Sequence, residues 1–165
     1  MPIETPGISR RRLLTVAAVG VPAMGALGAV NLFGAPAAKA NPYVPIDGLW
    51  GSGTTAGLQE VLGTPVDGIV SSQNESWRKY NPALTSGWEW VPGEMATGST
   101  VIAALQSRIG ANSDGLLGQS TIRLLQRWVG APVSGFFDNP RRDRRGNEPS
   151  NGVYELQLRL QKGTI

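Results

Sequence analysis

Four stretches of the chain place apolar side chains at the spacing of one helix face. Each contains a Leu-Gln pair, and three continue to a glycine, as LQEVLG (58–63), LQSRIG (105–110) and LQRWVG (125–130). The pattern predicts four helices of about ten residues each. Their apolar positions are Leu58 and Leu62; Val101, Ile102, Leu105 and Ile109; Ile122, Leu125 and Val129; and Val153, Leu156 and Leu160.

The ends of these helices are marked by residues with known capping preferences. Gly63, Gly110 and Gly130 directly follow the last apolar positions, where a left-handed C-cap is expected. Ser99 and Ser150 precede two of the helices and are the predicted N-caps.

The helices are part of an internal repeat. Residues 46–70, IDGLWGSGTTAGLQEVLGTPVDGIV, align without a gap with residues 113–137, SDGLLGQSTIRLLQRWVGAPVSGFF, and 11 of 25 positions are identical. Such a repeat sets the architecture of a chain. The sequence therefore predicts a mainly α fold, a small bundle of short helices joined by DGxxG turns in two pseudo-repeats. The first repeat spans 41–97 and the second 98–165.

The phrase DGxxG predicts a stiff connector between helices. Glycine accepts the positive φ of a tight turn, and aspartate can bond to the backbone that follows it. We expect Leu49 and Leu116 to point inward from their turns. Two polar stretches outside the repeat, 71–97 and 138–149, are predicted to be long loops, which often carry binding groups.

The first 40 residues have the pattern of a signal peptide. Arg10, Arg11 and Arg12 precede an apolar stretch that ends in Ala38-Lys39-Ala40, a small-x-small cleavage site. The adjacent arginines resemble a twin-arginine export signal. We therefore expect cleavage after Ala40, a secreted or cell-wall location, and no stable membrane insertion afterwards. An uncleaved anchor is the alternative, which Pro22, Pro36 and many glycines disfavour.

Removal of this segment changes the charge of the chain. Residues 41–165 hold 11 basic and 11 acidic side chains, so the pattern gives no reason to expect a nucleic-acid partner. The chain has no Cys and no His. Disulfides, Ser-His-Asp triads, Cys-His peptidases and His-ligated zinc sites are thereby excluded on residue type. No cofactor motif or metal-ligand spacing is present, and we expect neither.

The linked order of LQxxLG, DGxxG and threonine, found twice, resembles the peptidoglycan-binding domain family. The resemblance covers about residues 46–163. It implies a bundle of short helices and non-catalytic binding to peptidoglycan or another cell-wall polymer. The chain departs from the pattern at Ser134 and Leu117, which replace Asp67 and Trp50 of the first copy, and no helix is predicted directly before Asp47.

Aromatic side chains are the first candidates for contact with a sugar, because they can stack on its apolar face. Trp50 lies in a turn and is expected to be partly exposed, whereas Trp128 is expected in the core. The alternative for the others is that they pack the long loop onto the bundle. The candidate substrate-binding residues are Trp50, Trp77, Trp88, Trp90, Gln59 and Gln126.

Two other functions remain open from the sequence. A small cell-wall hydrolase would need two carboxyl groups, one with a raised pKa, and Glu89 or Glu94 could supply the acid; no pair stands out, and no catalytic residue is assigned. An adaptor could instead hold a secreted hydrolase. The arginines of 141–145 could meet an anionic polymer, although a solvated loop is the commoner explanation.

Overall fold

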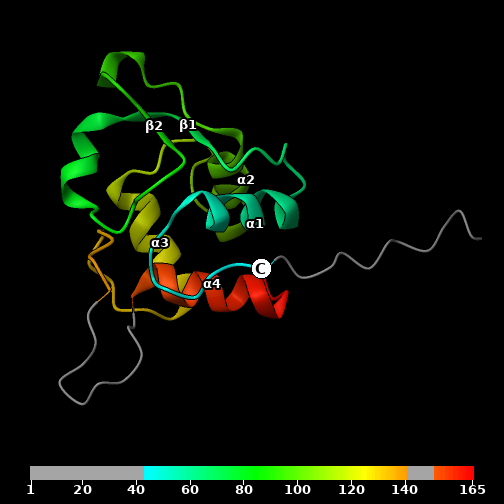
Figure 1. The fold of residues 1–165 in the computed structure, drawn as a ribbon. Coiled ribbons are helices and arrows are strands. Elements are labelled where there is room, and N and C mark those ends of the chain that lie inside the picture. Colours follow the sequence, from blue (N-terminus) through cyan, green and yellow to red (C-terminus); the bar gives the residue numbers. More distant parts are fainter. Residues whose placement is uncertain (1–42, 141–150) are drawn as a thin grey trace, which may run out of the picture. The chain divides into compact units, whose positions relative to one another are not determined.

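A computed structural model of the chain describes residues 43–140 and 151–165, and the four predicted helices are present in it (Figure 1). Three of them end, as predicted, at glycines in the left-handed conformation, with φ of 71° at Gly63, 73° at Gly110 and 84° at Gly130. None of the described helices is long and apolar enough to cross a membrane. The helices are α1 (Ser52–Leu62), α2 (Thr100–Ile109), α3 (Gln119–Val129) and α4 (Gly152–Lys162).

The helix N-termini agree less well with the sequence. Ser99 is the N-cap residue of α2, but its side chain makes no capping hydrogen bond. The N-cap of α4 is Asn151, whose side chain accepts a hydrogen bond from the amide of Tyr154 at 2.8 Å. Ser150, the signal segment and the arginines of 141–145 lie outside the described residues.

The prediction of a mainly α bundle is wrong. The stretch 71–97, expected to be a loop, contains most of a two-stranded parallel sheet formed by β1 (Val70–Asn74) and β2 (Trp88–Val91). It also contains two 3-10 helices, η1 (Glu75–Tyr80) and η2 (Gly93–Met95). About 46% of the described residues are in helices and about 10% are in strands. The protein is therefore a small mixed α/β domain.

The sheet was missed because nothing local in the sequence marks β1, and the four residues of β2 are too few to predict a strand without it. β1 has one apolar residue, Val70, and no alternation of apolar and polar positions. Its pairing with β2 is irregular, since Val70 lies opposite Trp88 and Gln73 opposite Trp90. Strand formation here depends on tertiary pairing and on the burial of Val70 and Gln73 rather than on intrinsic propensity.

The helices form a closed ring of contacts. α1 packs against α2 and α4, and α3 packs against the same two helices. All described residues from 43 to 165 belong to one compact unit, so the stretches 41–97 and 98–165, predicted as two repeats, share one core.

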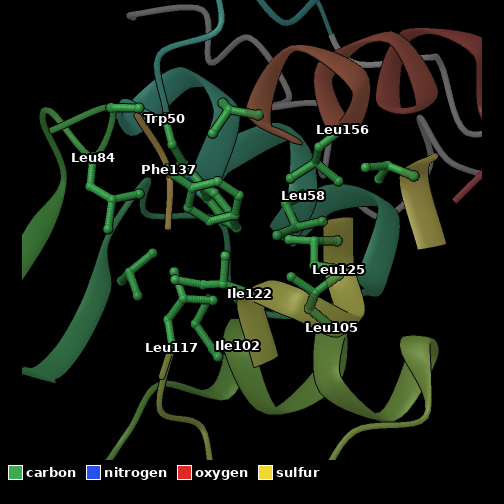
Figure 2. Packing of buried hydrophobic residues seen from close by; sticks show 14 of the residues in the cluster. Trp50, Leu58, Leu84, Ile102, Leu105, Leu117, Ile122, Leu125, Phe137 and Leu156 are labelled. Carbon is green, nitrogen blue, oxygen red and sulfur yellow. The ribbon is translucent and has the colours of Figure 1, made fainter. Parts of the chain in front are cut away.

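The core is built from the helices and from the fourth residue of each of four turns, at 47–50, 67–70, 114–117 and 134–137 (Figure 2). The expectation that Leu49 and Leu116 point inward is met only in part, because both are half-buried and only Leu49 packs against the core. The next residue along the chain is the buried one in each turn, since a tight turn directs consecutive side chains to opposite sides. These four core residues are Trp50, Val70, Leu117 and Phe137.

Candidate ligand-binding site

Each α-helix holds one turn in place through a buried glutamine. We name the turns by position: turn 1 (47–50), turn 2 (67–70), turn 3 (114–117) and turn 4 (134–137). In turn 3, the Gln106 side chain accepts from the amide of Gly115 at 2.7 Å and donates to the Asp114 carboxylate at 2.7 Å and the Leu116 carbonyl at 3.0 Å. Gln59 holds turn 2 and Gln126 holds turn 4 in the same way.

The fourth glutamine, Gln157, joins the last helix to the first turn. Gln157 of α4 accepts from the amide of Gly48 at 2.8 Å and donates to the Leu49 carbonyl at 2.9 Å, across 109 and 108 residues respectively. Turn 1 therefore obtains from the C-terminal helix what the other turns obtain from the helix just before them. This explains why no helix is predicted before Asp47.

The aspartates of the turns have structural roles. The Gln59 side chain donates to Asp67, as does the amide of Ile69, and these bonds hold the pKa of Asp67 below its ordinary value of 3.8. Burial raises the pKa of Asp114, but hydrogen bonds from Gln106, the Leu116 amide and Asn112 together outweigh it and lower the pKa. In turn 4 the Ser134 hydroxyl takes the place of the carboxylate.

Three predicted ligand contacts are in the interior of the protein. Gln59 and Gln126 are 3% and 2% exposed, and their amides are used by the turns. Trp50 has no exposed surface, and its indole N–H donates to the Thr55 hydroxyl at 3.0 Å. The expectation of a partly exposed Trp50 is wrong, because its position in the turn is the one that faces the core.

Trp88 and Trp90 form a stacked pair above that core. Their ring centroids are 5.5 Å apart with an interplanar angle of 14°. Trp88 also meets Trp50 edge-on and donates its indole N–H to the Trp50 carbonyl at 3.0 Å. Trp128, expected in the core, is half-buried, with the Arg159 guanidinium 4.8 Å from its ring. Trp88 and Trp90 therefore pack β2 onto turn 1.

The segment that follows η1 joins turn 1 to turn 4. The Trp50 amide donates to the Ala83 carbonyl at 2.8 Å, and the Ala83 amide donates to the Phe137 carbonyl at 3.0 Å. Asn81, only 1% exposed, accepts from the Phe137 amide and donates to the Trp77 carbonyl, both at 2.9 Å. These bonds fix η1, in the first repeat, beside turn 4 in the second repeat.

A pocket of about 280 Å³ opens between turn 4 and the start of α4. Phe136 and Pro132 supply apolar surface, and most of the other lining residues carry carboxylate, amide or hydroxyl groups. Asn151 joins both sides, because its side-chain N–H groups donate to the carbonyls of Gly48 and Asp138 at 3.1 and 3.0 Å. The residues that line the pocket include Pro132, Ser134, Phe136, Asp138, Asn139 and Asn151.

Two further aromatic rings continue from the pocket along η1. The Tyr80 ring lies 5.8 Å from that of Phe136, and the Trp77 ring lies 6.5 Å from that of Tyr80. Tyr80 is 49% exposed, and Trp77 and Phe136 are half-buried. We call Trp77, Tyr80 and Phe136 the aromatic row. Of the predicted candidates, only Trp77 lies in it.

A second pocket, of about 220 Å³, occupies the corresponding place at turn 1. At the first and third positions of the turn, turn 1 has Asp47 and Leu49 where turn 4 has Ser134 and Phe136, and both pairs line their pockets. The pocket at turn 1 has hydroxyl groups and glycines but no aromatic side chain in its lining. The two pockets therefore lie at equivalent places of two similar turns and differ in chemistry.

Sequence reasoning missed Phe136, Asp138, Asn139 and Asn151. One signal was available for Phe136, which replaces the aliphatic residue found at the same position of the other three turns, Leu49, Ile69 and Leu116. The polar residues come from two segments that only the folded chain brings together. Nothing in their local sequence distinguishes them from loop residues.

The remaining candidate chemistry does not gather at this pocket. Glu89 accepts a hydrogen bond from the Ser72 amide at 2.9 Å, and Glu94 lies in η2; neither lines the pocket. Within residues 43–140 and 151–165, no group of three or more His, Cys, Asp or Glu could hold a metal ion.

No protein-family model, curated protein or solved structure matches the chain.

Proposed function

We propose that the chain is an exported, non-catalytic protein that binds the peptidoglycan of the cell wall, with the pocket at turn 4 as its binding site. The observation that carries the proposal is the composition of this pocket: one aromatic wall, Phe136, faces side chains that can donate and accept hydrogen bonds. A sugar presents a similar combination, since its ring has apolar faces and its rim carries hydroxyl and amide groups.

The rigidity of the pocket also supports binding. Turn 4 is held by Gln126, which is 2% exposed and bonds to Ser134, Gly135 and Phe136. The opposite side is fixed by the bonds of Asn151. A site whose groups are already in place loses little entropy when a ligand binds.

The two turn aspartates with shifted pKa values, Asp67 and Asp114, are not suited to acid catalysis. A glycosidase needs one carboxyl group with a raised pKa to protonate the leaving oxygen. Asp67 and Asp114 instead have lowered pKa values, because hydrogen bonds within the turns stabilise their charged forms. A carboxyl group in that state is a poor proton donor at neutral pH.

The aromatic wall provides the test. Phe136→Ala should lower the fraction of protein that sediments with purified insoluble peptidoglycan, raising the apparent Kd by about tenfold. Ile69→Ala is the matched control, because Ile69 holds the same position in turn 2, is 45% exposed and does not line the pocket. Equal sedimentation of both variants and of the unaltered protein would move the site away from turn 4.

A further inference from the structure

We infer that the aromatic row binds successive sugar rings of one glycan strand, whose end or side groups enter the pocket at turn 4. The inference rests on the proposed function and deepens it, because it assigns recognition to the polysaccharide of the wall rather than to its peptides. The three rings come from η1 and turn 4, which lie about 56 to 59 residues apart in the chain.

The spacing of the rings suits a chain of sugars. The centroid separations of 6.5 and 5.8 Å are comparable to the length of one pyranose unit. The interplanar angles are 63° and 44°, so a strand that contacts all three rings must twist from one sugar to the next. Aromatic rings are effective in such contacts because they bury a large apolar area with little loss of side-chain entropy.

The row is held in position by a buried side chain. Asn81 is 1% exposed and bonds at 2.9 Å both to the Trp77 carbonyl and to the Phe137 amide. One amide group therefore fixes the distance between η1 and turn 4. The Lys79 ammonium lies over one face of the Tyr80 ring, 4.8 Å from its centroid, so a sugar would contact the other face.

The polar end of the row favours a glycan over a peptide helix or an apolar partner. Beyond Phe136 the surface continues into the carboxylate and amide groups of Asp138, Asn139 and Asn151. An amphipathic helix would need an apolar groove at this place. Sugar hydroxyl and acetamido groups can instead donate to the carboxylate and exchange hydrogen bonds with the amides.

The experiment is a titration of the purified protein with β-1,4-linked N-acetylglucosamine oligomers, from the single sugar to the hexamer, followed by calorimetry and tryptophan fluorescence. Affinity should rise by about tenfold or more from the single sugar to the trimer, as each ring adds a contact. Trp77→Leu should remove most of this gain while leaving the affinity for the single sugar nearly unchanged, and Trp77→Phe should restore most of it.

The control and the contrary results are equally specific. Tyr43→Ala removes an aromatic side chain that is 91% exposed and lies next to Val44, which bonds to Gln161 near the C-terminal end of α4; it should change nothing. An affinity independent of oligomer length, or insensitive to Trp77→Leu, would overturn the glycan-strand inference even if peptidoglycan still sediments the protein. If the protein binds the oligomers with an affinity that rises with their length but does not sediment with peptidoglycan, the proposed function alone would be overturned.

Discussion

At the scale of single residues, the protein depends on one repeated arrangement, a buried glutamine that satisfies the backbone of an Asp-Gly or Ser-Gly turn. A buried backbone group without a partner is costly, and Gln106, which has no exposed surface, supplies partners for one amide and one carbonyl of turn 3. The same residue bonds to the Asp114 carboxylate. The glutamine and aspartate of the repeat are therefore explained by the stability of the turn.

This arrangement predicts acid sensitivity. The folded protein holds the pKa of Asp67 and of Asp114 below the ordinary value of 3.8, so the unfolded chain takes up protons first as the pH falls. The stabilisation is present above that value and is lost as the pH drops through it towards the lower folded pKa. In Asp67→Asn/Asp114→Asn, the fall in Tm between about pH 6 and pH 3 should be smaller than in the unaltered protein.

The matched control removes two carboxyl groups that are not in turns. Glu75→Gln/Glu94→Gln changes two exposed side chains of the 3-10 helices and should keep the original dependence of Tm on pH. If the two double variants flatten the curve equally, the turns are not the source of the acid sensitivity.

At the scale of elements, α4 stabilises a turn that lies at the other end of the described chain. Gln157 bonds to Asp47, Gly48, Leu49 and Thr54, and Asn151 bonds to the Gly48 carbonyl. The ring of helix contacts, α1 to α2 to α3 to α4 and back to α1, is closed at this point. Turn 1 should therefore be only as stable as the docking of α4.

Loss of the Gln157 side chain should destabilise turn 1 more than the other turns, and amide hydrogen exchange can measure this. Gln157→Leu should lower the free energy of unfolding by about 2–5 kcal/mol, because several hydrogen bonds are lost and buried amides remain unpaired. Amide hydrogen exchange at Gly48 should accelerate more than at Gly115. Gln106→Leu should produce the opposite pattern, and Lys162→Leu, an exposed change on α4, should produce neither. Unchanged protection of Gly48 in Gln157→Leu would show that α4 does not hold turn 1.

The elements also show what the sequence could and could not predict. The helices and their C-caps were predictable because apolar period and terminal glycine are local signals. The pairing of β1 with β2 was not, because β1 carries no local strand pattern and its partner residues, such as Trp90 opposite Gln73, are set by tertiary pairing. Nor was the burial of Trp50, whose inward direction depends on the shape of turn 1. The pocket at turn 4 could not be predicted because turn 4 and the start of α4 meet only in the folded chain.

At the scale of the whole molecule, the repeat builds similar turns whose surroundings differ. The pockets at turn 1 and turn 4 occupy corresponding places, but only the second has an aromatic wall and the adjacent rings of η1. One specialised pocket on a repeated scaffold is consistent with the proposed binding of a cell-wall ligand. Under this proposal it acts outside the cell without a cofactor, on the cell wall itself.

The most direct test of this account is co-sedimentation of the purified protein with insoluble peptidoglycan, with soluble sugar and turbidity followed in the same tube. We expect the protein to sediment with the wall in a saturable manner, while no sugar is released and the turbidity stays constant. Protein that remains in the supernatant at every wall concentration, or steady release of soluble sugar, would contradict non-catalytic binding of peptidoglycan.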